Sequence, residues 1–301
     1  MKKTLLLTSI LLLSYACANK VNTDTTTKET TATTVVNNDT INMDKNIDFD
    51  RLPNAVKDSL NRFPKYEEII AGMVFKNDGT RTKNIVQFAA IDSLLITADV
   101  YTTNPKNPYI LLCHQAGYSR GEYNNTVKEL LLMGYNCVAL DQRSGGKVNG
   151  IINETAKRAK EKGLSTEYLD AKADIFAAID FTYELNNKKP IIIVGSSYSA
   201  TLVMLIANKN AKVKKVAAFS PGEYFQGISI MQNLAGFDKP VYVTGTKEEV
   251  PKIKTMCKLI SPSYLNVYEP KEAGTHGSKA LWYSNQGYMG YWQSFKAFLK
   301  K

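Results

Sequence analysis

Residues 190–208 limit the fold of this chain more than any other stretch of its sequence. Residues 191–194 form a continuous β-branched apolar run, which is typical of a strand buried on both faces of a parallel sheet. The pentapeptide Gly-Ser-Ser-Tyr-Ser follows directly at 195–199, and residues 200–207 then have the apolar composition of a buried helix. The stretch therefore predicts a strand, a sharp turn and a helix, with Ser197 at the apex of the turn.

This turn has the sequence that a nucleophilic serine requires. A nucleophile elbow holds its central residue in a strained conformation and brings strand and helix so close that the residues two before and two after it must be small. Gly195 and Ser199 meet this demand, with Ser199 in place of the more usual glycine. Over residues 85–301 the chain resembles the α/β-hydrolase superfamily, and most of all its small uncapped members of the dienelactone-hydrolase and serine-esterase type.

The rest of the chain alternates strand-like apolar runs with helical segments. This alternation predicts an α/β protein with a mainly parallel sheet covered by helices on both faces. The resemblance implies an α/β-hydrolase fold with an eight-stranded sheet, and the stretch between residues 219 and 241 is too short for a large cap domain. The expected strands are 85–88, 94–101, 109–113, 135–140, 191–194, 213–219, 240–244 and 264–268, and the expected helices are 52–61, 120–133, 166–185, 200–207, 228–234, 252–259 and 279–299.

The chain has only two histidines, which narrows the choice of a catalytic base. A serine hydroxyl is a poor nucleophile at its own pKa and needs an adjacent base to take its proton. His276 lies in a glycine-flanked loop after the last expected strand, where the resemblance places the catalytic histidine. We therefore expect Ser197 and His276 to act together.

The third member of the triad is an acid that orients the histidine. The segment from residue 245 resembles the family's Gly-x-x-Asp pattern after a strand, with Glu248 in the Asp position. The order Ser197, Glu248, His276 is that of the superfamily, and either carboxylate type can hold the imidazole in one tautomer. Glu249 and Glu223 remain the alternative acids.

Two backbone amides are expected to bind the oxyanion. One is the amide of Tyr198, directly after the nucleophile. The sequence His114-Gln-Ala-Gly resembles the family's His-Gly-x-Gly loop, which implies Ala116 as the second donor, with Gln115 as the alternative. His114 is expected to anchor this loop, and the chemistry requires no cofactor and no metal.

Three further features complete the expected site. Asp141 and Arg143 resemble a structural pair beside the oxyanion turn, and residues 147–165 form either a flap over the site or a surface excursion. The candidates for an apolar wall of an open pocket are Tyr224, Phe225, Ile228 and Met231.

The N-terminus has the pattern of an export signal. Residues 1–16 combine a basic start, a short apolar run and a small-residue cleavage site. Cys17 after Ala16 resembles the lipidated cysteine of bacterial lipoproteins, and cleavage by an ordinary signal peptidase is the alternative. We expect residues 17–46 to be a Thr/Asn-rich tether, residues 47–84 a helical extension and residues 85–301 the hydrolase domain.

Charge and cysteine content restrict the partners. The formal net charge is +10, and it falls to +8 once Lys2 and Lys3 leave with the signal. No nucleic-acid motif accompanies this charge, so we expect a solvated basic surface that suits anionic lipid headgroups. Cys113, Cys137 and Cys257 lack metal-site spacing, and we expect buried thiols without a disulfide framework.

These features together predict an exported enzyme. We expect a carboxylesterase-like serine hydrolase that cleaves a small-molecule ester through an acyl-enzyme, anchored by lipid in the cell envelope and facing the periplasm, with the cell surface as the alternative. Amide or thioester cleavage and acyl transfer would use the same triad, and a non-catalytic binding lipoprotein would keep the fold alone. Oligomeric state is left open by the sequence.

Overall fold

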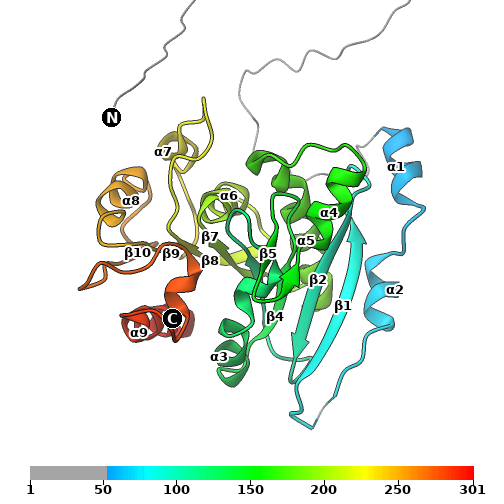
Figure 1. Cartoon of the computed structure of the whole chain (residues 1–301), viewed down its shortest axis with the longest axis horizontal. Coiled ribbons are helices and arrows are strands. Elements are labelled where there is room, and N and C mark those ends of the chain that lie inside the picture. The colour runs from blue at the N-terminus through cyan, green and yellow to red at the C-terminus, as the bar shows by residue number, and fades with distance from the viewer. Residues whose placement is uncertain (1–52, 77) are drawn as a thin grey trace, which may run out of the picture. The chain divides into compact units, whose positions relative to one another are not determined.

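The computed structural model describes residues 53–76 and 78–301 (Figure 1). The chain divides into two units, Met1–Ile41 and Asn42–Lys301, and all described residues belong to the second. The expected signal peptide, Cys17 and the tether therefore lie outside the described residues. Within the part that the structure describes, no helix has the length and apolar character of a membrane span.

An eight-stranded sheet organises the described chain, in the order β1-β2-β4-β3-β7-β8-β9-β10. The first two strands and β4 pair antiparallel, and every other neighbouring pair is parallel, which confirms the mainly parallel sheet (Figure 1). The strands are β1 (Thr82–Ala89), β2 (Leu95–Thr102), β3 (Tyr109–Cys113), β4 (Asn136–Leu140), β7 (Ile191–Ser196), β8 (Val213–Phe219), β9 (Val241–Thr244) and β10 (Leu265–Tyr268).

Two hydrophobic cores lie on opposite faces of this sheet because successive strand residues point to opposite sides. In β3, Leu111 belongs to the core under α5 and α6, whereas Leu112 belongs to the core under α3 and α9. Both residues are fully buried, as the apolar run predicts. The helices are α1 (Asn54–Leu60), α2 (Tyr66–Ala71), α3 (Thr126–Leu132), α4 (Glu154–Glu161), α5 (Ala171–Leu185), α6 (Tyr198–Ala207), α7 (Ile230–Asn233), α8 (Val250–Met256) and α9 (Tyr288–Lys300).

Only α7 and loops separate β8 from β9, so the expectation of no large cap domain is confirmed. Three expected helices each divide into a short 3₁₀ turn and an α-helix. They are η2 (Arg120–Tyr123) followed by α3, η3 (Tyr168–Asp170) followed by α5, and η4 (Ser278–Leu281) followed by α9. η4 ends at Leu281, and Gly287, in the left-handed conformation (φ 81°), lies directly before the first residue of α9.

The N-terminal extension packs on the main domain. Its first helix is α1, and a second helix, α2, was not expected from the sequence. The Tyr66 ring makes edge contacts with Phe88 of β1 and Phe181 of α5, and its hydroxyl donates to the Ala177 carbonyl. β1 begins at Thr82, inside the stretch expected to belong to the extension.

The segment 147–165 packs against β2. It forms a small hairpin, β5 (Lys147–Val148) with β6 (Ile151–Ile152), followed by α4. The Thr97 amide of β2 donates to the buried Thr155 hydroxyl at 2.9 Å, and Arg158 donates to the Leu95 carbonyl at 2.8 Å. These contacts attach α4 to β2, the strand next to the edge strand β1.

Asp141 and Arg143 do not pair with each other, so this expectation is wrong. The loop after β4 turns Arg143 toward α5, where Asp174 accepts both its backbone amide and its guanidinium. Asp141 instead accepts from Arg120 at 2.5 Å, and it also accepts the first amide of α4. Both residues connect elements around the sheet, but they do so with separate partners.

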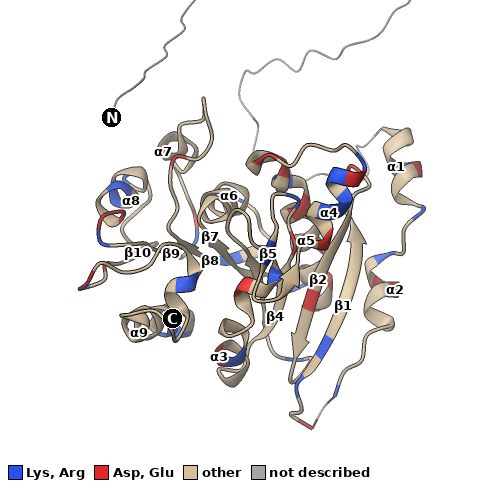
Figure 2. Cartoon of the chain, viewed as in Figure 1, with Lys and Arg blue, Asp and Glu red and all other residues tan. Residues whose placement is uncertain are grey.

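Charged residues are interspersed over the described elements. In α4 the basic residues lie between glutamates at its two ends, and Lys and Glu side chains lie close together around α8 (Figure 2). Cys113, Cys137 and Cys257 are buried free thiols, as the sequence predicts.

Candidate active site

Ser197 lies at a sharp turn between β7 and α6. Its backbone has φ 58° and ψ −126°, a strained conformation for a residue with a side chain. A Cβ on Gly195 would lie 2.5 Å from the Ser199 carbonyl oxygen and 2.6 Å from the Ala200 Cα, so only glycine fits there. Ser199 also suits its position, because its hydroxyl accepts from the Ser196 amide and donates to the Cys113 carbonyl of β3 at 2.8 Å. The elbow predicted from the sequence is therefore present.

His276 joins Ser197 to a carboxylate. Its Nε2 lies 2.9 Å from the Ser197 hydroxyl, and its Nδ1 lies 2.5 Å from Oε1 of Glu249. The three residues come from the β7–α6 turn, the loop after β10 and the loop after β9. These distances give the hydrogen-bond relay of a Ser-His-acid triad.

The acid beside His276 is Glu249, and the preferred candidate Glu248 was one residue off. Glu248 is exposed, whereas Glu249 folds back over the loop. Its Oε2 accepts from the Thr246 amide at 2.9 Å while the Thr246 hydroxyl accepts from the Glu249 amide at 3.2 Å. These reciprocal bonds are those of a capping box, and the Thr-x-x-Glu spacing at 246–249 is the sequence signal that distinguishes the two glutamates.

Glu223, the other alternative, lies away from the histidine. Its carboxylate is the acceptor for the Ile230 amide at the start of α7, at 3.4 Å. Its side chain is exposed beside the loop that follows β8. It has no contact with the triad among the described residues.

The surroundings of Glu249 favour its ionised form. Burial acts to raise its pKa, but hydrogen bonds from His276, Ser220 and Thr246 outweigh burial and lower the pKa of Glu249 to about 2. The Ser220 hydroxyl donates to Oε2 at 2.7 Å and accepts the Gly277 amide at 2.8 Å. The Ser220 hydroxyl, just after β8, therefore fixes both the Glu249 carboxylate and the loop that carries His276.

The two expected oxyanion donors are free in the described chain. Neither the Tyr198 amide nor the Ala116 amide has a hydrogen-bond acceptor among residues 53–76 and 78–301. The alternative, Gln115, is excluded because its amide donates to Glu122 at 2.7 Å. Ala116 therefore remains the predicted second donor.

His114 is fully buried and anchors the loop, as expected. Its Nδ1 donates to the Gln115 carbonyl at 2.8 Å, and its Nε2 accepts from the Gln142 amide at 3.0 Å. Burial lowers the pKa of His114 to about 4 despite these hydrogen bonds, so the ring is neutral near pH 7. It is a structural residue of the loop that carries Ala116.

Tyr224 lies closer to the nucleophile than the sequence suggested. Its hydroxyl is 3.4 Å from the Ser197 Oγ and donates to the Ser220 carbonyl at 3.0 Å. Phe225, in contrast, is buried in the core under α6 and forms no part of an open wall. Ile228 and Met231 are partly buried near α7.

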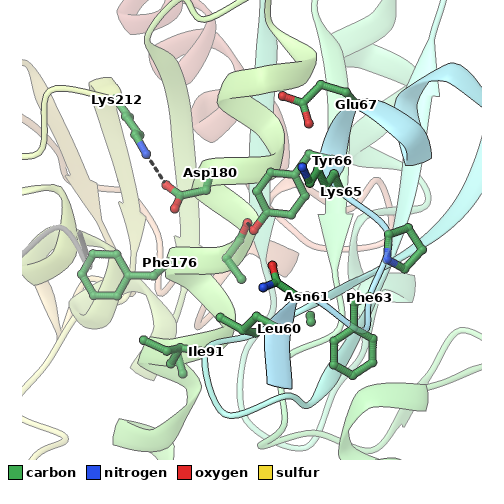
Figure 3. A pocket seen from close by; sticks show the side chains of 14 residues that line it. Leu60, Asn61, Phe63, Lys65, Tyr66, Glu67, Ile91, Phe176, Asp180 and Lys212 are labelled. Atoms are coloured by element: carbon green, nitrogen blue, oxygen red, sulfur yellow. Dashed lines mark hydrogen bonds and ion pairs between the residues drawn. The ribbon is translucent and has the colours of Figure 1, made fainter. Parts of the chain in front are cut away.

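A pocket of about 430 Å³ lies elsewhere, between the N-terminal extension and α5 (Figure 3). Apolar side chains such as Leu60, Phe63 and Phe176 line it, and the Asp180–Lys212 ion pair lies at its edge. It contains none of the triad residues. Among the described residues, no cluster of His, Cys, Asp or Glu is arranged to hold a metal ion.

Comparison with known proteins agrees with this architecture. Residues 104–247, just under half of the chain, match the family described as serine aminopeptidase, S33. A search of curated proteins found no match.

Solved structures share the fold at low sequence identity. An esterase from Pyrococcus furiosus superposes with a TM-score of 0.57 at 16% identity, covering 76% of this chain and 96% of its own. Dienelactone hydrolase from Anabaena variabilis gives 0.56 at 12% identity, covering 73% and 97%. An acylaminoacyl peptidase gives 0.54 at 15% identity, covering 74% of this chain and 42% of its own. The chain therefore has the α/β-hydrolase fold, and the family match supports its place in the α/β-hydrolase superfamily.

Proposed function

We propose that this protein is a serine hydrolase that cleaves a carboxylic ester through an acyl-enzyme intermediate. The observation that carries the proposal is the relay from the Ser197 hydroxyl through His276 to Glu249, with hydrogen bonds of 2.9 and 2.5 Å. A purely structural role would not need this combination of a strained serine, an imidazole and an ionised carboxylate, because simpler residues could fill it.

The proposed reaction begins at Ser197. Its Oγ attacks the ester carbonyl carbon while His276 Nε2 takes the hydroxyl proton, and Glu249 holds Nδ1–H and stabilises the imidazolium. The amides of Tyr198 and Ala116 bind the oxyanion of the tetrahedral intermediate. His276 then gives the proton to the departing alkoxide, which leaves Ser197 acylated. A water activated by His276 hydrolyses this ester and restores the free serine.

An ester is favoured as the substrate by the open architecture and by the fold neighbours. The short connection between β8 and β9 leaves the serine without a large cap. The neighbours include an esterase and a dienelactone hydrolase, but also an acylaminoacyl peptidase, and the matching family is described as an aminopeptidase. Peptide cleavage by the same triad is therefore the second candidate.

The test uses a fluorophosphonate probe and a graded set of p-nitrophenyl esters, with aminoacyl p-nitroanilides as the peptidase arm. We expect the wild type to be labelled and to hydrolyse the esters, and Ser197→Ala to do neither. Faster turnover of the anilides would assign the peptidase activity instead. A folded wild type that neither reacts with the probe nor cleaves either substrate set would refute the proposal and leave a binding protein of this fold.

We also propose that the protein is exported and lipidated at Cys17, on the sequence pattern of residues 1–17 alone. The mature protein should then partition into the detergent phase and give an acylated N-terminal peptide by mass spectrometry. Cys17→Ala is the matched control and should remain in the aqueous phase. Protease accessibility in intact cells and in spheroplasts distinguishes the favoured periplasmic location from the cell surface.

A further inference from the structure

Glu122 is a buried carboxylate for which the triad gives no explanation. It lies in η2 and is fully buried. Other buried acids, Asp99, Asp141 and Asp174, each form an ion pair with an arginine. No Lys, Arg or His of the described chain lies within ion-pair distance of Glu122. A buried charge without a cationic partner is expensive, so hydrogen bonds must offset its loss of hydration.

Those hydrogen bonds come from two loops of the catalytic site. Oε2 accepts the Gln115 amide of the oxyanion loop at 2.7 Å, and Oε1 accepts the Ser278 hydroxyl of the histidine loop at 2.5 Å. The Ser196 hydroxyl, next to the nucleophile, lies near the carboxylate and acts to lower its pKa. One side chain therefore hydrogen-bonds the loops that carry Ala116 and His276 and lies beside the Ser197 turn.

The hydrogen bonds around Glu122 favour its ionised form. The Gln115 amide can only donate, and the Ser196 hydroxyl accepts the Ser278 amide at 2.8 Å, so its own proton is free to point toward Glu122. Burial raises the pKa of Glu122 above its ordinary value, although the hydrogen bonds from Ser278 and Gln115, the nearby Ser196 hydroxyl and the charge of Lys279 oppose this rise. A carboxylate, which only accepts hydrogen bonds, suits this set of donors.

The contact with Gln115 bears on the oxyanion hole. Glu122 takes the Gln115 amide, whereas the next amide along the loop, that of Ala116, has no acceptor among the described residues. The Gln115 carbonyl is fixed in turn by His114 Nδ1 and by the Tyr118 amide. Both polar backbone groups of Gln115 are thus held, which fixes the peptide that carries the Ala116 amide and gives the preorganisation that oxyanion binding requires.

The histidine loop is held from two sides. Ser220, hydrogen-bonded to Glu249, accepts the Gly277 amide, and Glu122 accepts the Ser278 hydroxyl on the following residue. Glu249 thus orients the imidazole, while Glu122 fixes the distance between the imidazole loop and the oxyanion loop.

We propose that Glu122 is a positioning residue whose buried carboxylate sets the oxyanion loop, the histidine loop and the nucleophile in register. This inference rests on the serine hydrolase proposed above. The test compares Glu122→Gln with the wild type in ester hydrolysis and in the rate of fluorophosphonate labelling. Glutamine keeps the shape but presents an N–H₂ toward one of the donors.

We expect kcat and the labelling rate to fall roughly 30- to 300-fold, near the loss seen on removing an oxyanion donor, while KM changes less than about threefold. The matched control is Asp99→Asn, another fully buried carboxylate, which pairs with Arg120 and Lys83 away from the serine. It should lower the unfolding temperature but keep kcat. Ser278→Ala, which removes one bond to Glu122, should lower kcat about tenfold and serves if Glu122→Gln does not fold.

The outcomes separate the two proposals. A wild type that is not labelled refutes the hydrolase and the role of Glu122 with it. If the wild type is labelled and Glu122→Gln folds with unchanged kcat, only the role of Glu122 is refuted. If Glu122→Gln does not fold, an unchanged kcat in Ser278→Ala refutes that role instead. If Asp99→Asn and Glu122→Gln had the same unfolding temperature and the same loss of kcat, Glu122 would be a stabilising residue and not a positioning one.

Discussion

The triad region and the pocket under the N-terminal extension differ in the chemical groups that line them. At the triad, a serine, a histidine and a carboxylate converge, and the backbone amides of Tyr198 and Ala116 have no acceptor among the described residues. In the pocket, apolar side chains surround about 430 Å³, and the polar groups at its edge satisfy one another. Lys212 pairs with Asp180 at 2.7 Å, and the Tyr66 hydroxyl donates to a carbonyl (Figure 3).

This difference shows that an apolar pocket and the reactive side chains of a protein can lie at different places in the fold. A large apolar pocket is the usual first hypothesis for an active site. Here the pocket under the extension holds none of the triad residues, which lie in loops at the carboxyl edge of the sheet. The hydrogen-bonded chain from one hydroxyl to an imidazole and a carboxylate, with free backbone amides in the neighbouring loops, identifies the site better than volume does.

Removing the base should have the largest effect on the triad region. In His276→Ala, Ser197 loses its proton acceptor, so kcat should fall on the order of 10⁴-fold or more. Steady-state hydrolysis of a p-nitrophenyl ester measures this loss. The urea unfolding midpoint should change little, because the half-buried imidazole is held by two side-chain contacts. A variant with more than a tenth of the wild-type rate would exclude His276 as the base.

Replacing the acid should have the next largest effect and distinguishes two adjacent residues. In Glu249→Gln, the imidazole loses its charged partner, and kcat should fall roughly 10³- to 10⁴-fold. Glu248→Gln is the matched control, since Glu248 is exposed, and its kcat should stay within about twofold. The reverse result would show that the loop after β9 has a different register in the active enzyme.

The pH dependence of stability should show that the histidine anchoring the oxyanion loop, His114, is neutral in the folded protein. Unfolded His114 gains its proton near pH 6.5, whereas the folded residue stays neutral until its pKa of about 4. The unfolded state therefore binds more protons between these values, and the free energy of unfolding falls as the pH falls. The single-residue contribution is about 3 kcal/mol, lost between pH 6.5 and pH 4.

The control for this prediction is His114→Asn, which has no ionisable ring. Urea unfolding at pH 7, 5.5 and 4 should give a wild-type stability that declines relative to the variant. Taking the difference cancels the opposite contribution of Asp174, whose pKa burial raises to about 6. An imidazole resonance of His114 that titrates near pH 6.5 in the folded protein would contradict the prediction.

How far the sequence predicted this molecule depends on the range of the interactions involved. The elbow is local, because a buried strand, small residues and a helix are adjacent in the chain, so Ser197 and its conformation could be predicted. His276 followed from the small number of histidines and from its loop. The eight strands and the short β8–β9 connection likewise follow from local apolar runs and their spacing.

The errors have two origins, a local capping signal that the sequence prediction did not use and contacts that depend on how distant segments meet. Glu248 and Glu249 differ by one position in a loop, and only the Thr246 capping box fixes which of them turns inward. Arg143 pairs with a residue of α5 and Asp141 with a residue of η2. The two-residue spacing of Asp141 and Arg143 in the sequence could not reveal these partners. Glu122 looks like an ordinary helix glutamate until the fold brings the loops of Gln115 and Ser278 to it.

The smallest expected effect belongs to the pocket and tests whether the two regions are independent. Ala173 of α5 lines the pocket, and Ala173→Leu would fill part of the space without a polar group or a helix-breaking side chain. We expect kcat/KM to stay within about twofold and the free energy of unfolding to rise by up to about 1 kcal/mol. The matched change is Ala200→Leu in α6, where the fully buried residue lies against Gly195 and no space exists. That variant should lose stability and labelling by the phosphonate probe, because overpacking displaces the elbow. If Ala173→Leu instead lowered kcat/KM tenfold while the protein stayed folded, α5 would have to transmit the change to the Ser197 turn, and the pocket could no longer be treated as separate from the chemistry.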